Sequence, residues 1–301
     1  MTDPFELSED APVRVGVALT ATATATGKSE VSETMMRARL SSFAAALGAA
    51  TKLPTEPQAF ADYPELLDAM RCGSVDIAWL PPVIALRAAS AGRALPIALP
   101  VRRGVSSFFT ALFTQVGSAV QRPADLSGVR AAWVDKNSAS GFLVIRAALR
   151  AQGLDLQKAF FAESFVGSHD AVVRAVVNGT VDVGATYVHH DARAGGVWRA
   201  GWGDASVHVV SRVGPIPSDV IAAGVHVPVR RIRQVQRALL TAKNAELGAA
   251  AGVLLEAESF VEATSEHLAP LEALLGFLED TAERWSSVMP PPVSMPPQRG
   301  E

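Results

Sequence analysis

The sequence predicts an α/β protein of two lobes, each a mainly parallel sheet flanked by helices. Short apolar runs alternate with segments of helical spacing, a rhythm typical of parallel sheets. The rhythm breaks at the turn-rich segment 121–128 and then restarts, so the chain has two similar halves. Hydrophobic residues make up 49% of the 301 residues and charged residues 19%, which is enough apolar material for two cores.

The first half alternates strands and helices from residue 13 onward. Val13–Leu19 alternates and is rich in valine, which predicts a strand. Two helices are expected, ended by Gly48 and by Cys72-Gly73, and a third is opened by Pro81-Pro82. The expected helices cover 33–47, 61–71 and a segment from 81, and the further strands cover 75–80, 95–99 and 106–114.

The second half begins with the segment Val129–Leu149. Val129–Val134 reads as a buried strand, Asp135–Gly141 as a turn, and Phe142–Leu149 as a helix. A loop or irregular helix is expected at 192–205, a rigid turn at Pro215–Asp219, and a Pro-rich tail at the end. The remaining expected strands cover 160–165, 181–185, 207–212 and 221–227, and the helices 168–177, 228–243, 248–258 and 266–285.

The turn before Phe142 has the composition of an anion site. The first turn of a helix carries unpaired N–H groups and a positive dipole end. Ser138 and Ser140 add hydroxyl donors, and Gly141 would let a ligand approach the backbone. Together these features favour a small anion such as phosphate or phosphonate. A purely structural alternative stays open, in which Asn137 or Ser138 only caps the helix.

Composition excludes several classes of function. A net charge of −3 and a pI near 6.1 give no basic field for nucleic acid. The single cysteine, Cys72, allows no internal disulfide and no multi-cysteine metal site. Adjacent His189 and His190 point apart on a regular element, so we expect no metal ion and no cofactor. No apolar run reaches the roughly 18 residues of a membrane span, so no membrane insertion is expected.

Six segments in a fixed order resemble a known family. They are D-I-A-W-L-P-P at 76–82, D-L-S-G-V-R at 125–130, N-S-A-S-G-F-L-V at 137–144, G-S-H-D at 167–170, N-G-T-V-D-V at 178–183 and P-I-P-S-D at 215–219. Together they are similar to the phosphate, phosphite and phosphonate substrate-binding proteins of ABC importers, the PhnD-like family with a type II periplasmic-binding-protein fold. The likeness covers roughly residues 13–245.

The resemblance implies two lobes joined by two crossover strands, near Ser106–Thr114 and Val207–Pro215. It also implies a small oxyanion ligand in the cleft and an ABC permease as partner; we expect a monomer. The family is periplasmic, but no signal segment precedes Val13, so the chain as written is expected in the cytoplasm. The expected division is a disordered N-terminus 1–12, lobe I at 13–110 and 213–287, lobe II at 111–212 and a tail at 288–301.

Carried over residue by residue, the resemblance implies six ligand-binding positions: Ser138, Ala139, Ser140, His169, Asp219 and Tyr63. His169 would supply positive charge near neutral pH. Asp219 would accept a proton from the ligand and so reject ligands that lack one. Structural roles also stay open for these residues: a helix-start histidine, a turn aspartate, and a tyrosine packing where its helix begins.

The chain departs from the family pattern at three places. Ala139 stands where the family has a threonine, which removes a hydroxyl donor but keeps the backbone N–H. Phe108 stands where the family has a tyrosine, and Tyr187–His190 holds no carboxylate for a ligand ammonium group. The fold therefore follows the family more closely than the ligand site does.

Three functions are compatible with these observations. The first is the substrate-binding component of an ABC importer, which performs no chemistry. The second is a cytosolic ligand-sensing module on the same fold. The third, an enzyme with His169 and Asp219 as an acid/base pair, lacks any nucleophile, metal or cofactor motif, so no enzymatic activity is expected.

Overall fold

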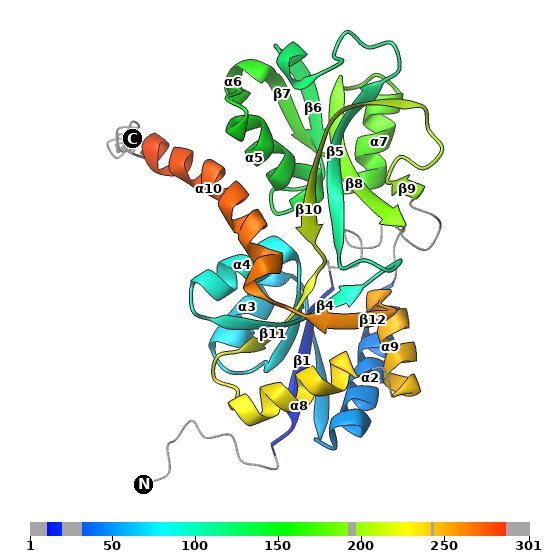
Figure 1. The fold of residues 1–301 in the computed structure, drawn as a ribbon, viewed down its shortest axis with the longest axis vertical. Helices are drawn as coiled ribbons and strands as arrows, with labels where there is room; N and C mark the ends of the chain where they lie inside the picture. Colours follow the sequence, from blue (N-terminus) through cyan, green and yellow to red (C-terminus); the bar gives the residue numbers. More distant parts are fainter. Residues whose placement is uncertain (1–10, 20–31, 192–196, 242–243, 287–301) are drawn as a thin grey trace, which may run out of the picture.

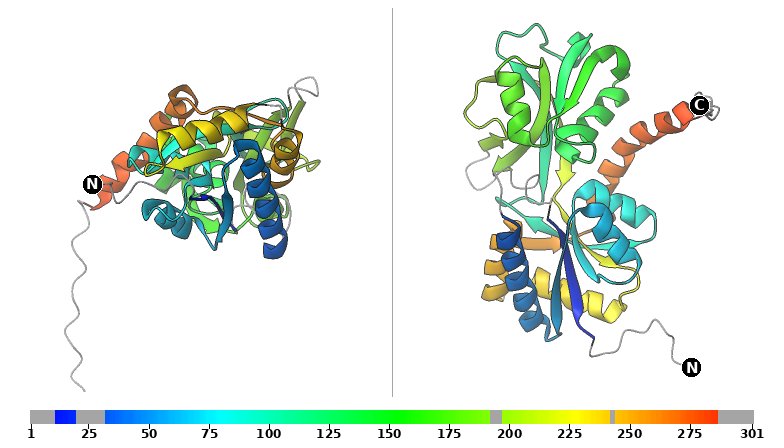
Figure 2. Two further views of the ribbon diagram at one scale, coloured as in Figure 1. Left: turned by 90° about the horizontal axis from the view of Figure 1, so that it is seen from below. Right: turned by 180° about the vertical axis from the view of Figure 1, so that it is seen from behind.

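The computed structural model describes residues 11–19, 32–191, 197–241 and 244–286. Two lobes lie end to end along the long axis, each with one sheet and helices packed on its faces (Figures 1 and 2). We call the lower one in Figure 1 lobe I and the upper one lobe II. The expected N-terminal segment, up to residue 10, and the Pro-rich tail lie outside the described residues.

Lobe I contains a six-stranded sheet in the order β12-β4-β11-β3-β1-β2. Its strands are β1 Val13–Ala18, β2 Thr55–Phe60, β3 Ile77–Leu80, β4 Ala94–Val101, β11 Val220–Gly224 and β12 Ser259–Glu262. Its helices are α2 Glu33–Thr51, α3 Tyr63–Arg71, α4 Pro82–Ser90, α8 Val229–Leu240 and α9 Ala245–Leu255. Apolar side chains of β1 and β3 meet those of α2 and α8 in one core, which explains the valine-rich alternation of the first strand.

Lobe II contains the second sheet, in the order β10-β5-β8-β6-β7, with β9 paired to β8. Its strands are β5 Ser107–Gln115, β6 Val129–Trp133, β7 Phe160–Phe165, β8 Val183–Asp191, β9 Val197–Ala200 and β10 Val207–Pro217. Its helices are α5 Val144–Ala151, α6 Leu156–Ala159 and α7 His169–Val177, and a short π-helical turn, Ala139–Leu143, runs directly into α5.

Two strands connect the lobes, as the sequence resemblance implied. β5 carries the chain out of lobe I and β10 brings it back, and the two pair antiparallel from Val207↔Gln115 to Pro217↔Ser107. The Ser218 amide then donates to the Ser106 carbonyl at 2.8 Å, which extends the pairing toward lobe I. The lobe boundaries expected at residues 110 and 212 stay a prediction.

The expectation of mainly parallel sheets is confirmed in outline, but each sheet also contains reversed strands. β2, β1 and β3 are parallel, and so are β7, β6 and β8. However, β11 returns from lobe II and enters between β3 and β4 antiparallel to both. In lobe II, β8 pairs antiparallel with β5. The connecting strands must reverse direction to return to lobe I, so both sheets are mixed.

Two strands were missed, and two local expectations were wrong. The polar strand β2 and the short β12 were missed, because neither shows strong apolar alternation. β8 continues to Asp191 and pairs with β9, which lies within the segment 192–205 that was expected to be a loop. Pro215–Pro217 forms the end of β10 instead of a turn.

The last helix, α10 Ser265–Ser286, leaves lobe I and packs against α5 of lobe II (Figure 1). Leu268, Leu271 and Leu275 are buried in one cluster with Leu143, the last residue of the π-helical turn, and Val144, the first residue of α5. Apolar contact therefore joins the two lobes close to that turn. Within the described residues no single helix is long and apolar enough to span a membrane; only α8 and α9 taken together as a bent pair reach that limit, by length and composition alone.

Candidate functional site

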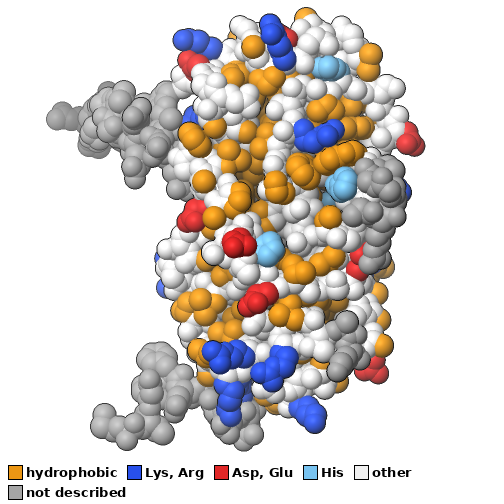
Figure 3. Space-filling model, in the orientation of Figure 1, with side chains coloured by type: hydrophobic (Ala, Val, Ile, Leu, Met, Phe, Trp, Pro, Cys, Tyr) orange, Lys and Arg blue, Asp and Glu red, His pale blue; other side chains and the backbone are white. Residues whose placement is uncertain are grey.

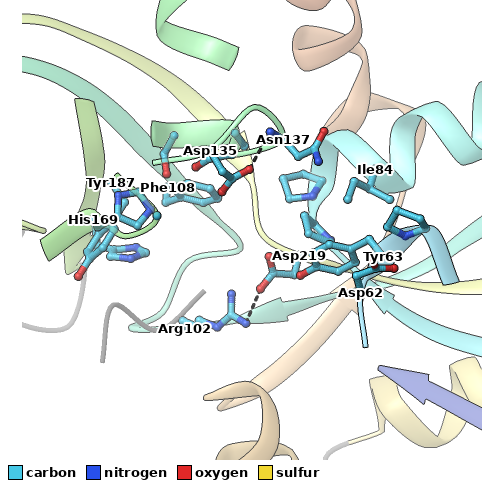
Figure 4. A pocket seen from close by; sticks show the side chains of 18 residues that line it. Asp62, Tyr63, Ile84, Arg102, Phe108, Asp135, Asn137, His169, Tyr187 and Asp219 are labelled. Carbon is cyan, nitrogen blue, oxygen red and sulfur yellow. Dashed lines mark hydrogen bonds and ion pairs between the residues drawn. The ribbon is translucent and has the colours of Figure 1, made fainter. Parts of the chain in front are cut away.

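A cavity of about 510 Å³ lies between the lobes, near the strands that connect them (Figure 4). Lobe I, lobe II and the connecting segments all contribute side chains to it. Its lining consists of Asp62, Tyr63, Pro64, Pro81, Pro82, Ile84, Arg102, Phe108, Asp135, Asn137, Ser138, Ala139, Ser140, Gly167, His169, Tyr187, His189 and Asp219. All six expected ligand-binding residues are in this set, so the fold brings them to one cavity; their roles stay predictions.

The turn that follows β6 presents backbone donors to the cavity. Ser138 is the N-cap, and its Oγ accepts from the Gly141 amide at 3.0 Å. The next two amides, those of Ala139 and Ser140, make no hydrogen bond within the described part of the chain. Thr110 Oγ1 donates to the Ser140 carbonyl at 2.5 Å and fixes the turn from β5. Ser138 is thus a cap, and the turn also has the donors of an anion site.

Gly141 has a different role from the one expected. A Cβ on this residue would lie 2.3 Å from Val134 Cγ2 and 2.7 Å from Val134 Cβ. Gly141 is buried and is not part of the cavity lining. Glycine is therefore required so that the turn can pack on the end of β6, not so that a ligand can approach the backbone.

His169 is the first residue of α7 and is almost completely buried, at 2% exposure. Its Nδ1 lies 3.0 Å from Thr186 Oγ1, in a hydrogen bond whose direction depends on the ring tautomer. Burial, followed by the nearby His189, lowers the pKa of His169 to about 4. The expectation of a positive charge near neutral pH is therefore wrong, because desolvation keeps this imidazole neutral.

Aromatic rings line the lobe II side of the cavity. His169 and Tyr187 meet at 5.0 Å between ring centroids, Tyr187 and His189 at 5.1 Å, and Phe108 and His189 at 5.8 Å. Burial, followed by Arg103 and Arg102, lowers the pKa of His189 to about 4. Both cavity histidines are therefore neutral at pH 7, and Phe108 occupies the place inferred from the resemblance without adding a hydroxyl.

The start of α3 forms the lobe I side. Asp62 is the N-cap of this helix, and its carboxylate accepts from the Glu65 amide at 2.9 Å. Tyr63 packs against the core formed by β1, β3, α2 and α8 and against the apolar cluster that joins the two lobes. It also lines the cavity. Packing at the start of a helix and contact with a ligand are therefore compatible roles for this tyrosine.

Asp219 forms an ion pair with Arg102, which the sequence interpretation did not anticipate. Arg102 Nη2 donates to Asp219 Oδ2 at 2.8 Å, and the two side chains are only 16% and 13% exposed. Figure 4 shows the pair at one edge of the cavity, with His169 and Tyr187 on one side and Tyr63 on the other. His169 and Asp219 thus have separate partners, Thr186 and Arg102, and this arrangement gives no support to an acid/base pair.

Sequence reasoning missed Arg102, Tyr187 and His189 as lining residues. Tyr187 and His189 lie two residues apart on β8, so an alternation extended past Ala185 would have placed both on one face. Arg102 follows the apolar strand β4 directly, at the end that reaches the other lobe. Among the described residues, no group of three His, Cys, Asp or Glu side chains could hold a metal ion.

Exposed basic residues gather away from this cavity. Arg230, Arg233 and Arg237 lie exposed on α8. In Figure 3 one group of Lys and Arg side chains lies at the lower end of this face, where α8 lies in Figure 1, and others lie toward the upper end. The cavity lies near the middle of the molecule, away from these three arginines of α8.

The two mixed sheets, two connecting strands and interlobe cavity define a type II periplasmic-binding-protein fold. Residues 29–268 match the family described as "ABC transporter, phosphonate, periplasmic substrate-binding protein". The match covers most of the chain, and the chain belongs to this family.

Solved structures agree on the fold. XAC2383 from Xanthomonas citri, bound to chloride, is 17% identical with a TM-score of 0.72 over 90% of this chain and 99% of that one. A binding protein component of an ABC phosphonate transporter (PA3383) from Pseudomonas aeruginosa is 19% identical, with a TM-score of 0.64 over 93% and 91%. PhnD1 from Prochlorococcus marinus, in complex with methylphosphonate, is 15% identical, with a TM-score of 0.61 over 89% and 98%.

Proposed function

We propose that this protein binds a small oxyanion of the phosphonate, phosphite or phosphate class in the interlobe cavity, as the substrate-binding component of an ABC importer. The family acts in transport and not as an enzyme, and membership implies a small ligand and a permease partner. The oxyanion class and its place in the cavity are our inference.

The observation that carries the proposal is the turn at Ser138–Ser140. Its two unpaired amides and the positive end of the helix that follows are suited to an anion. Ser140 is buried, lines the cavity and uses its hydroxyl in no described hydrogen bond, so the hydroxyl can serve as a further donor. These donors are neutral and fixed by the fold, so binding costs little reorganisation.

The remaining expected residues complete the site from other directions. The Nε2 of His169 is not used in any described hydrogen bond, and the Thr186 hydroxyl, by donating to Nδ1, would leave the proton on Nε2. In this tautomer His169 donates to a ligand oxygen without carrying charge. Tyr63 approaches from lobe I, so a ligand that contacts both lobes would favour the closed arrangement of the two lobes.

Bound anions in two similar structures support an anionic ligand. The Prochlorococcus protein was solved with methylphosphonate and a Xanthomonas protein with chloride, both of which are anions. This chain differs from the expected pattern at Ala139 and Phe108, which lowers the number of hydroxyl donors. We therefore expect weaker binding than a site with both hydroxyls would give.

A thermal-shift screen of the purified protein tests the proposal. The panel contains phosphate, phosphite, methylphosphonate, aminoethylphosphonate, sulfate and acetate. A ligand at 100 times its dissociation constant adds about 2.7 kcal/mol to the free energy of unfolding, which raises the melting temperature by several degrees. We expect such a rise with at least one phosphorus oxyanion.

Two variants identify the site in the same assay. Ser140→Ala and His169→Ala should each reduce the ligand-induced shift. A flat response of the wild-type protein across all phosphorus oxyanions would contradict the proposed ligand class. An unchanged shift in both variants would instead place the ligand elsewhere.

A further inference from the structure

The charges that line the cavity are unusual for an anion site. Three carboxylates face it, those of Asp62, Asp135 and Asp219. The two lining histidines are neutral at pH 7. Among the described residues that line the cavity, Arg102 is the only lysine or arginine. Among the described lining residues, Arg102 is therefore the one positive side chain that an entering anion meets.

Arg102 is held in a fixed orientation by two hydrogen bonds. Its Nε donates to the Leu255 carbonyl at the end of α9 at 2.8 Å, and its Nη2 donates to Asp219 Oδ2 at 2.8 Å. A guanidinium group has five N–H donors, so these two bonds leave three, none of which is used within the described part of the chain. The planar group is thus positioned, and donors remain for a ligand.

The pair also lies where the lobes connect. Arg102 directly follows β4, and Asp219 lies between β10 and β11. The adjacent Ser218 amide bonds to the Ser106 carbonyl at 2.8 Å, so both connecting segments are tied together next to the pair. A ligand bound to Arg102 would therefore lie next to the segments that connect the lobes.

We propose that Arg102 supplies the cationic contact of this site and that Asp219 is a positioning residue for Arg102, so that the site takes fully ionised oxyanions and requires no proton on the ligand. This inference rests on the proposed function and refines its substrate class. It replaces the expectation that Asp219 accepts a proton from the ligand.

The consequence concerns selectivity between phosphorus and sulfur oxyanions. A carboxylate that must accept a proton rejects a ligand without one, because its lone pairs would be buried unpaired beside a negative oxygen. A carboxylate already paired with a guanidinium group does not impose this requirement. Methanesulfonate has the shape of methylphosphonate but carries no proton at neutral pH. Of the two ligands, only methylphosphonate can therefore offer a proton to a carboxylate.

Calorimetric titration of the wild-type protein with both ligands decides between the two roles of Asp219. We expect methanesulfonate to bind within about tenfold of methylphosphonate. If the wild-type protein binds methylphosphonate but rejects methanesulfonate, and Asp219→Asn then accepts methanesulfonate, Asp219 is the proton acceptor and the inference is wrong. If the wild-type protein binds neither these ligands nor phosphate or phosphite, the proposed function itself fails.

Variants of the arginine test the other half of the inference. Arg102→Ala should weaken binding of both ligands by about 10- to 150-fold, the range for loss of a charge-assisted hydrogen bond. Arg102→Lys keeps the charge but not the fork of donors, so its affinity should be intermediate. Unchanged affinity in Arg102→Ala would overturn the assignment.

The neighbouring Arg103 offers a matched control. It carries the same charge and does not line the cavity. Its charge still reaches the cavity, since it lowers the pKa of His189, but it gives no lining donor to the ligand. Arg103→Ala should therefore weaken binding by less than about threefold, clearly less than Arg102→Ala. If the Arg102 variants do not fold, the wild-type comparison of the two ligands still decides the role of Asp219.

Discussion

The lobe II wall of the cavity and the connecting segments hold their polar groups in different ways. In lobe II, the turn at Ser138–Ser140 and the buried His169 present neutral donors fixed by helix starts and by hydrogen bonds to strands. At the connection, Arg102 and Asp219 present opposite charges fixed by each other. We infer that the first region sets where the oxyanion lies, and that the second supplies the positive charge.

The largest effect is expected from Gly141→Ala, which tests whether the lobe II turn depends on its packing. The new methyl group would lie 2.3 Å from Val134 Cγ2, so the turn must move away from β6. We expect a loss of about 1–3 kcal/mol in the free energy of unfolding, measured by urea denaturation, together with loss of ligand binding. Stability and affinity both equal to wild type would contradict the described packing.

Gly248→Ala is the control for this substitution. Gly248 is exposed on α9, and an added Cβ meets nothing within 4 Å. Alanine is the better helix former by about 1 kcal/mol, so this variant should be slightly more stable than wild type.

A smaller effect, confined to affinity, is expected from Ser140→Ala. A hydrogen bond to a charged ligand contributes about 1.5–3 kcal/mol, so calorimetry should show a dissociation constant about 10- to 150-fold higher. The neighbouring Ser138→Ala should differ, because Ser138 Oγ caps the helix through the Gly141 amide. It should lower stability by about 0.5–2 kcal/mol. Equal effects of the two variants on stability would show that the serines do not have separate roles.

The buried His169 predicts a dependence of stability on pH. In the folded protein its pKa is lowered to about 4, from a usual value of 6.5, chiefly by burial. Between these values the unfolded chain binds the proton and the folded chain does not, so the free energy of unfolding falls as pH falls from 6.5 toward 4. This stabilisation is fully present above pH 6.5.

Denaturation curves at several pH values measure this contribution. His169→Gln removes the titrating group and should flatten the decline relative to wild type. A slope that is the same in His169→Gln and wild type would mean that this imidazole charges in the folded state.

The smallest effect is expected from Phe108→Tyr. Phe108 lines the cavity on β5, next to the His189 ring. A tyrosine there would restore the hydroxyl that the family resemblance led us to expect. We expect a gain in affinity of a few-fold for methylphosphonate, since one neutral hydrogen bond contributes about 0.5–1.5 kcal/mol. A decrease in affinity would show that the cavity needs an apolar surface at this position.

The sequence was informative where local chemistry decides the structure. The strand, turn and helix around Ser138 follow from apolar patterning and turn residues, and the motif order indicated two lobes with two connecting strands. The mixed strand directions were not predictable from local patterns, because β11 enters the lobe I sheet only after a long excursion through lobe II. The polar strand β2 lies at the edge of its sheet and pairs only with β1, so its sequence shows little of the apolar pattern that predicts a strand.

In the candidate site, too, local sequence patterns predicted some residues but not the contacts between distant ones. Ser138, Ser140 and His169 could be placed because they stand at helix starts next to recognisable motifs. The Arg102–Asp219 pair joins residues 117 positions apart, and only the fold brings them within 2.8 Å. The neutral state of His169 also depends on burial by neighbours on other elements, which no local pattern reveals.

A crystal structure of the protein with methylphosphonate is the most direct test of the account. We predict that phosphonate oxygens accept hydrogen bonds from the Ala139 and Ser140 amides, and that the guanidinium group of Arg102 contacts the same anion. A phosphonate bound in the cavity away from the Ser138–Ser140 turn, with those two amides bonded to other groups, would contradict the central claim.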